Sequence, residues 1–176
     1  ANLTDMSQFR ANVDLKMKTY NLGFITAMLD PSLMREIRVP SGIGIRGNVK
    51  VDGSKYATRL AISEGKGSMK VEAKVDAKTK RDGSLDMNRL AYQAKVQARN
   101  IQAKHFLPKQ DLHTFTGDIE AKGVGTDFLS PRTYLVAHAK VNQVRYGKYN
   151  LTNVIAKAHV ENGRVHADVD SKNHYL

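Results

Sequence analysis

The sequence contains no cysteine and no tryptophan, and prolines and aromatic residues are few. The absence of cysteine excludes disulfide bonds and cysteine-ligated metal sites, and it is compatible with either a cytosolic or a periplasmic location. No uncharged apolar run approaches the roughly 18 to 20 residues that a membrane-spanning helix requires. The chain begins at Ala1 without an initiator methionine or a signal peptide, so we expect it to be an internal part of a longer protein.

The chain is strongly basic, with a formal net charge of +11. A charge of this size suggests nucleic acid or an anionic membrane surface as the partner. The charged residues do not cluster, however, but alternate with apolar residues, so that a strand would place them on one solvated face. The aromatic residues Phe9 and Tyr92 share the apolar parity and not the basic one. Stacking on single-stranded bases is therefore disfavoured, and we expect no nucleic-acid partner.

Strict alternation of apolar and polar residues is the main structural signal. It is clearest from Gly67 to Lys78, and it recurs at 9–18, 43–51, 90–98, 135–141 and 165–169. Such alternation predicts β-strands with one solvated face. The dipeptides Asp52-Gly53, Asp82-Gly83 and Asn162-Gly163 separate the runs and favour tight hairpin turns. Neighbouring strands should therefore pair antiparallel.

A few segments depart from this rhythm. Residues 22–37 have a helical spacing that is interrupted at Asp30-Pro31, which predicts one or two short helices. We also expect a turn around Ser130 and a β-bulge near Val154-Ile155, where the parity changes. The passage 53–78 is echoed by 147–172, so the hairpins resemble copies of one unit.

The residues of the apolar parity are unusually small. Alanines occupy many of these positions: Ala73, Ala77, Ala91, Ala94, Ala98, Ala121, Ala137, Ala139, Ala156, Ala158 and Ala167. A β-sandwich normally packs bulky residues across a core about 10 Å thick. Either the sheet curves tightly on itself as a barrel or sandwich with a small-residue core, or something other than protein fills the concavity.

No catalytic or metal-binding pattern is present in the sequence. The histidines show no helical i, i+4 pair, and we expect those in strands, His138, His159 and His166, at solvated polar positions. Gly123-Val124-Gly125 is too short for a nucleotide fingerprint and favours a turn or bulge. The acid pair Asp118 and Glu120 shares one solvated strand face instead of converging in a cleft. We expect no enzyme activity, no metal site and no cofactor.

The order of motifs resembles a known family. The segments YNLGFI at 20–25, LDPSL at 29–33 and VPSGIGIRGNVKVDG at 39–53 resemble the helical plug and following G-x-V-x-G strand of TamB-like proteins of the AsmA-like group, in their Bacteroidetes form. The segments 101–108, 117–127 and 149–154 resemble other parts of the same pattern. Together they cover most of the chain.

The resemblance implies a periplasmic protein that an N-terminal helix outside this chain anchors in the inner membrane. Members of the group form a long U-shaped β-sheet with a hydrophobic channel, and they are linked to phospholipid movement toward the outer membrane. Some act with an outer-membrane β-barrel protein in protein insertion, and here such a partner would bind outside the present chain.

We therefore expect an all-β chain in which residues 1–176 form a single segment, a curved antiparallel sheet or U-shaped groove built from repeated hairpins. Phospholipid acyl chains would lie on its apolar face, and lysines and arginines would neutralise phosphates at the groove mouth. The isolated chain would also self-associate. The expected lining residues are Val13, Leu15, Met17, Ile43, Ile45, Val49, Val51, Leu60, Ile62, Met69, Val71, Val75, Leu90, Tyr92, Val96, Ile119, Leu135, Val165 and Val169. The alternative is a structural or adhesive β module that binds protein or polysaccharide.

Overall fold

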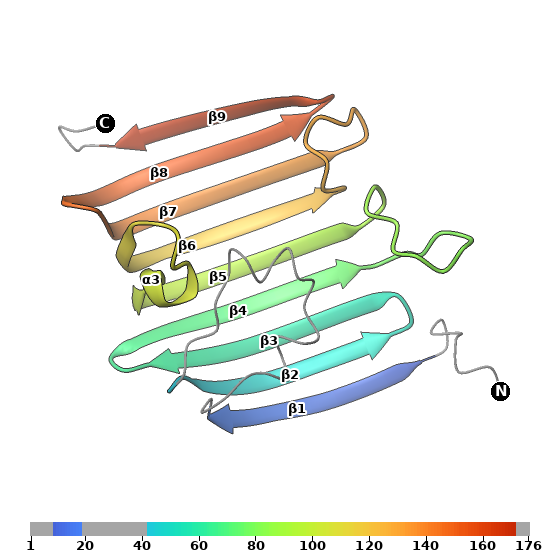
Figure 1. The fold of residues 1–176 in the computed structure, drawn as a ribbon, viewed down its shortest axis with the longest axis horizontal. Helices are drawn as coiled ribbons and strands as arrows, with labels where there is room; N and C mark the ends of the chain where they lie inside the picture. Colours follow the sequence, from blue (N-terminus) through green and yellow to red (C-terminus); the bar gives the residue numbers. More distant parts are fainter. Residues whose placement is uncertain (1–8, 19–41, 172–176) are drawn as a thin grey trace.

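The computed structural model describes residues 9–18 and 42–171, and nine strands in these ranges form one antiparallel sheet in chain order (Figure 1). The strands are β1 (Arg10–Lys18), β2 (Gly44–Asp52), β3 (Lys55–Glu64), β4 (Gly67–Asp76), β5 (Ala91–Gln102), β6 (Leu112–Val124), β7 (Tyr134–Tyr146), β8 (Tyr149–Glu161) and β9 (Arg164–Ser171). A single helical turn, α3 (Ala103–Phe106), connects β5 to β6. The helical element expected at 22–37 lies outside the described residues.

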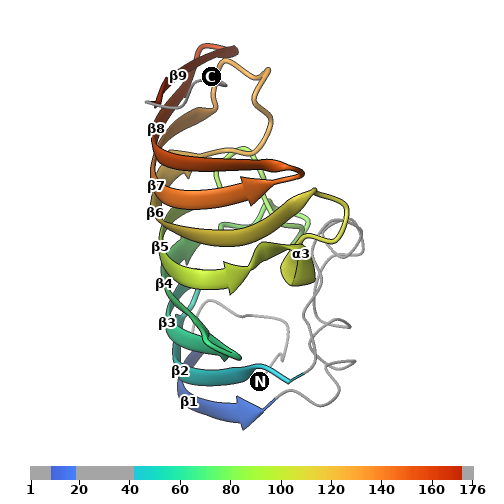
Figure 2. The same cartoon turned by 90° about the vertical axis from the view of Figure 1, so that its left-hand side faces the viewer.

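The sheet is open and curved. Seen edge-on, it bends gently, and α3 lies on the inner side of the bend (Figure 2). Within the described ranges β1 and β9 each pair with one neighbour only, and the sheet neither closes into a barrel nor packs against a second sheet. The expected all-β, curved antiparallel architecture is therefore confirmed. No helix in these ranges is long and apolar enough to cross a membrane.

Tight turns with left-handed residues connect most neighbouring strands. The β8–β9 hairpin turns through Asn162 and Gly163, with φ of 54° and 68°, as the type I′ turn requires. Gly53 and Gly147 take φ of 56° and 53° at the equivalent places in the β2–β3 and β7–β8 hairpins, which matches the predicted echo. Asp82-Gly83 also lies in a tight turn, in which the Gly83 N–H donates to the Lys80 carbonyl at 3.1 Å. This turn closes the Thr79–Leu85 bridge within a longer loop and does not join β4 and β5 directly.

A line of backbone irregularities crosses one end of the strands. The β5–β6 register shifts between Ala98 and Ile101, where Asn100 is left-handed with φ of 52°. Asn153 in β8 is also left-handed, with φ of 53°, so the parity changes near Val154 as the sequence indicates. The predicted bulge is wrong in one respect. The β7–β8 register has no shift there, because β7 changes parity at the facing position, Asn142.

Candidate functional site

The strand register assembles one continuous apolar face. Direct cross-strand partners share a face, so apolar-parity residues line up in rows that run across the whole sheet. One such row consists of Leu15, Gly47, Leu60, Val71, Val96, Ile119, Ala139, Ala156 and Val169. The alternation within each strand thus becomes a surface shared by all nine strands.

Every expected lining residue falls on this face or directly before a strand that contributes to it. Ile43 and Leu90 precede β2 and β5, and the other expected residues lie within strands in apolar-face rows. Two of the alanines that the sequence assigned to the apolar parity do not lie on the apolar face of a strand. Ala91 pairs with Asp76 on the opposite, polar face, and Ala77 lies beyond the end of β4. Alanine tolerates either face, so its parity is a weaker guide than that of valine or isoleucine.

Alanines form a row of their own. From β4 to β9 each strand places an alanine directly beside the next: Ala73, Ala94, Ala121, Ala137, Ala158 and Ala167. At about 4.8 Å per strand the row is about 24 Å long and perpendicular to the strands. Larger residues border it, for example Val71 and Val96 on one side and Val75 and Tyr92 on the other. The small side chains therefore form the floor of a shallow trough between larger ones.

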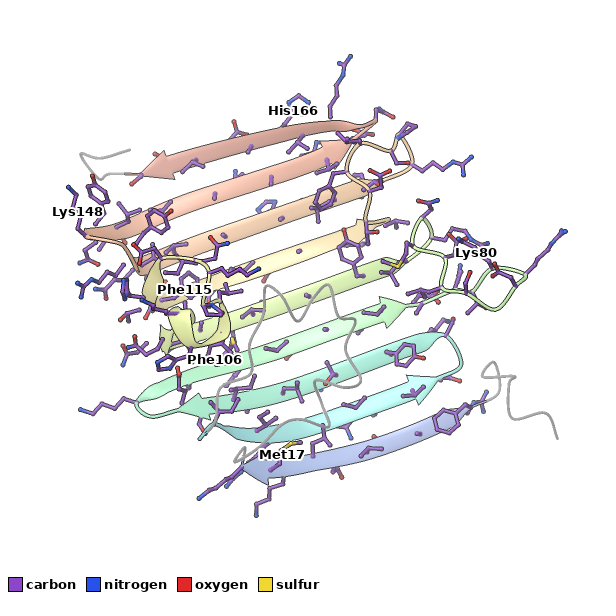
Figure 3. The ribbon with its side chains drawn as sticks, in the orientation of Figure 1. Met17, Lys80, Phe106, Phe115, Lys148 and His166 are labelled. Atoms are coloured by element: carbon purple, nitrogen blue, oxygen red, sulfur yellow. The ribbon has the colours of Figure 1, made fainter. Side chains whose placement is uncertain are left out.

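The apolar face is covered at the α3 end of the strands and at Val160 near the far end of β8, which is 2% exposed, and much of the face between is open. Ala98 and Ile101, at the end of β5 that leads into α3, are 1% and 3% exposed. Ile119, on the neighbouring strand and the same face, is 36% exposed, and Val165 and Val169 on β9 are about 60% exposed. Phe106 of α3 and Phe115 of β6 lie together at the covered end (Figure 3).

Glu64 ties α3 and its flank to the sheet. The carboxylate Oε2 of Glu64 accepts a hydrogen bond from the backbone N–H of Gln102 at 3.0 Å, and its Oε1 contacts Nδ1 of His105. The Glu64 side chain is only 11% exposed. These contacts fix the start of α3 above the end of β3, so the cover over Ile101 is held by a specific polar link.

Two glycines allow aromatic rings to lie flat on the apolar face. Gly123 is the direct cross-strand partner of Tyr92, and a Cβ on Gly123 would come within 2.7 Å of the Tyr92 hydroxyl oxygen. A Cβ on Gly117 would similarly meet the ring of Phe115 at 2.9 Å. Burial raises the pKa of the Tyr92 hydroxyl. Aromatic rings thus replace the missing side chains, which keeps the face continuous where the strands carry glycine.

Sequence reasoning missed the lining residues beyond the backbone irregularities. Ile101, Val144 and Leu151 extend the apolar face at the α3 end. Their parity is opposite to that of the apolar-face residues in the longer part of each strand, because the chain changes phase near Asn100, Asn142 and Asn153. The available signal was the asparagines at these positions: Asn100 and Asn153 are left-handed, a conformation that asparagine adopts more readily than most residues.

The opposite, polar face is crossed by ion pairs between neighbouring strands. Nζ of Lys95 lies 2.6 Å from Oε1 of Glu120, and Nη1 of Arg99 lies 2.8 Å from Oδ1 of Asp118. The hydrogen bond from Arg99 lowers the pKa of Asp118, and the Glu120 carboxylate raises the pKa of Lys95. These side chains are substantially exposed, so the pairs contribute little stability and mainly satisfy charges on a solvated face.

The polar face also carries hollows. Two overlapping hollows of about 450 and 630 Å³ share the lining residues Lys50, Ala57, Lys74 and Gln93. Most lining residues of both hollows belong to polar-face rows, so the hollows lie mainly on the polar side. The apolar-face rows contribute Tyr56, Val75, Tyr92 and Gly123 to the first hollow, and Thr58 and Ala73 to the second. Within the described residues neither Lys50 nor Lys74 forms an ion pair. A basic hollow around Lys50, Ala57 and Lys74 therefore lies behind the apolar face.

The described histidines do not converge on a common centre. His159 and His166 are direct partners on the polar face, and the ring of His159 makes an edge contact with Tyr134 at 5.7 Å. His138 pairs with Lys157, so it lies in a different row. Across residues 9–18 and 42–171 no group of three or more His, Asp or Glu side chains is arranged to hold a metal ion.

Gly123-Val124-Gly125 ends β6 and enters a turn in which Gly125 has φ of 80°. Gly123 and Val124 are thus extended strand residues, and only Gly125 takes a conformation that favours a turn.

Comparison of the chain with protein-family models, curated proteins and solved structures returns no match. The physical properties of the two sheet faces are therefore the basis for a functional proposal.

Proposed function

We propose that this chain is a segment of a lipid-conducting groove whose apolar face holds phospholipid acyl chains. The observation that supports this most is the continuous apolar face of nine strands, much of which remains exposed although every strand contributes to it. The resemblance to TamB-like proteins gives the biological setting: periplasmic phospholipid transport and outer-membrane biogenesis, with membrane anchoring and any β-barrel partner outside this chain.

The dimensions of the face suit acyl chains. Nine strands at about 4.8 Å span about 38 Å across the sheet, whereas one leaflet of a bilayer's hydrocarbon core is about 15 Å thick, half of the full ~30 Å. An acyl chain lying in the alanine row would therefore cross about three strands. Neighbouring positions along the row are nearly equivalent, so each methylene gains about 0.8 kcal/mol by leaving water wherever the chain lies. Strong overall binding is then compatible with sliding.

A pair of matched substitutions tests the proposal. Val71→Asp adds a negative charge on the apolar face next to the alanine row, and Gln93→Asp adds the same charge on the polar face. Purified chain is incubated with phosphatidylglycerol and examined by native mass spectrometry, with circular dichroism to confirm the fold. Val71→Asp should reduce the lipid-bound fraction about tenfold or more, because an acyl chain cannot solvate a carboxylate, and Gln93→Asp should have little effect. Equal losses, or an unmodified chain that binds no lipid, would contradict the proposal.

A second candidate is an adhesive β module that binds an acidic polysaccharide or protein through the polar face. The observation in its favour is the basic hollow around Lys50 and Lys74 on the polar face. Dextran sulfate is a suitable probe. If Lys50→Ala with Lys74→Ala abolishes dextran sulfate binding while Val71→Asp does not, and the chain ignores lipid, the adhesive function is the better account.

A further inference from the structure

Among residues 9–18 and 42–171, strand β9 is an uncovered edge of the sheet. It pairs with β8 on one side, and every residue from Arg164 to Asp170 is exposed. An open edge presents unpaired backbone N–H and C=O groups, which are a template for pairing with another strand.

The hairpin turn determines which backbone groups of β9 point outward. In a two-residue turn the flanking residues, here Glu161 and Arg164, form a hydrogen-bonded pair, and such pairs then alternate along the strands. The backbone groups of Arg164, His166, Asp168 and Asp170 therefore face β8. Those that point away from the sheet include the groups of Val165, Ala167 and Val169.

The antiparallel order of the strands limits how two copies can share one sheet. Eight successive antiparallel pairings separate β1 from β9, so these two strands run in the same direction. Joining β9 to β1 of a second copy therefore gives either a parallel pair or two apolar faces on opposite sides. A two-fold axis perpendicular to the sheet instead pairs β9 with β9 antiparallel and keeps both apolar faces on one side.

The sequence of β9 is self-complementary about Ala167. With the axis at this residue, Arg164 lies opposite Asp170 of the second copy, and His166 lies opposite Asp168 of the second copy. These polar pairs occupy the non-hydrogen-bonded positions, where side chains approach most closely. On the apolar face Val165 meets Val169, and the outward backbone groups of these residues and of Ala167 meet each other.

Neighbouring registers lack this match. An axis at Asp168 places two aspartates opposite each other, and an axis at His166 leaves Asp170 beyond the paired strand. Like charges directly opposite each other destabilise a strand pair. The complementarity is therefore specific to one register.

We propose that β9 is a self-recognition edge through which two copies of this chain form a two-fold dimer with one continuous sheet. The dimer joins the two alanine rows at Ala167 and doubles the apolar face. It depends on backbone pairing and charge, not on lipid, so it stands or fails independently of the lipid-binding proposal.

Charge reversal tests the register. Asp170→Arg places arginine opposite Arg164 at both symmetric sites, and Asp170→Arg with Arg164→Glu restores opposite charges. All proteins carry Glu161→Gln, because Glu161 faces residue 164 within the hairpin. Sedimentation velocity should show a dimer for the background protein, a dissociation constant raised about tenfold by Asp170→Arg, and recovery in the double variant. A monomeric background protein, or a double variant as weak as the single one, overturns the proposal.

A cysteine placed at the axis tests the symmetry. The chain contains no cysteine, so an introduced one is unique. In the proposed dimer the two Ala167 Cα atoms are about 5.5 Å apart, within the range that a disulfide bridges. Ala167→Cys should form disulfide-linked dimers under mild oxidation, whereas the exposed control Ala61→Cys on the interior strand β3 should not. Equal cross-linking of both variants would show random collision and contradict a specific edge.

A proline separates edge pairing from stacking of apolar faces. Ala167→Pro removes an outward N–H without removing a bond to β8, so it should abolish the dimer while the fold is retained. Added phosphatidylglycerol should leave the edge dimer intact. A dimer that survives Ala167→Pro but dissociates with lipid is a face-to-face dimer, and the edge proposal is then wrong.

Discussion

Two isoleucines on neighbouring strands show how differently the two parts of the apolar face are used. Ile101 near the end of β5 is 3% exposed and lies where α3 begins, whereas Ile119 in β6 is 36% exposed in the middle of the open face. Both have apolar-face positions in the same sheet. The difference shows that parity decides which face a side chain occupies, whereas cover by another element decides whether that face acts as a core or as a surface.

The largest expected effect comes from the same substitution at both positions. Ile101→Asp should destabilise the fold by about 4 kcal/mol, because it buries an unpaired carboxylate under α3. Ile119→Asp should cost only about 1 kcal/mol, since its carboxylate can reach water. Urea unfolding followed by circular dichroism measures both. Equal costs would mean that the face at Ile119 is closed in solution.

Loosening the link between α3 and the sheet should make the covered end resemble the open one. Glu64→Ala leaves the Gln102 N–H without its acceptor and should cost about 1 to 3 kcal/mol. Hydrogen exchange should show faster exchange at Gln102 and residues 103–107 but not in β8. Glu64→Gln, which retains an acceptor oxygen, is the matched control and should recover much of the protection.

A larger side chain in the alanine row should weaken lipid binding on the open part of the apolar face without changing the covered part. Ala137→Leu raises the trough floor in β7, where solvent leaves room for the larger side chain, so stability should change by less than about 1 kcal/mol. If acyl chains lie in the trough, phosphatidylglycerol affinity should fall about threefold to tenfold. Val136→Leu, on the polar face of the same strand, serves as the control in the same mass-spectrometry experiment. An unchanged affinity would place the acyl chains elsewhere on the apolar face.

The smallest effect concerns the polar face. The pKa of Asp118 is lower in the fold because Arg99 donates a hydrogen bond to its carboxylate. The contribution of this carboxylate to stability is therefore present above the unfolded pKa of about 4. It is lost as the pH falls through the folded pKa. Asp118→Asn should therefore be slightly less stable than the unmodified chain at neutral pH, and the difference should shrink as the pH falls below about 4 and disappear below the lowered folded pKa of Asp118. Unfolding midpoints across this pH range test the sign.

The face assignment could be predicted from the sequence to a large extent. Strands with strict alternation, such as β4, and turns with Asn-Gly or Asp-Gly specify local conformation through side-chain period and backbone freedom. The alternation of β4 is sufficient to place Val71 and Lys70 on opposite faces, because successive side chains of a strand point to opposite sides. Stretches with glycine or mixed parity, such as β6 and β8, carried a weaker signal, because Gly117 and Asn153 interrupt the period.

The sequence by itself thus determined that the chain forms antiparallel strands with one apolar and one charged face, because these properties depend on the two-residue period and on turn chemistry. Only the tertiary structure decided that the strands align their alanines from β4 to β9, that α3 covers Ile101 but not Ile119, and that the described sheet stays open. Register, cover and closure depend on contacts between residues far apart in the chain, and the period of a single strand contains no information about them.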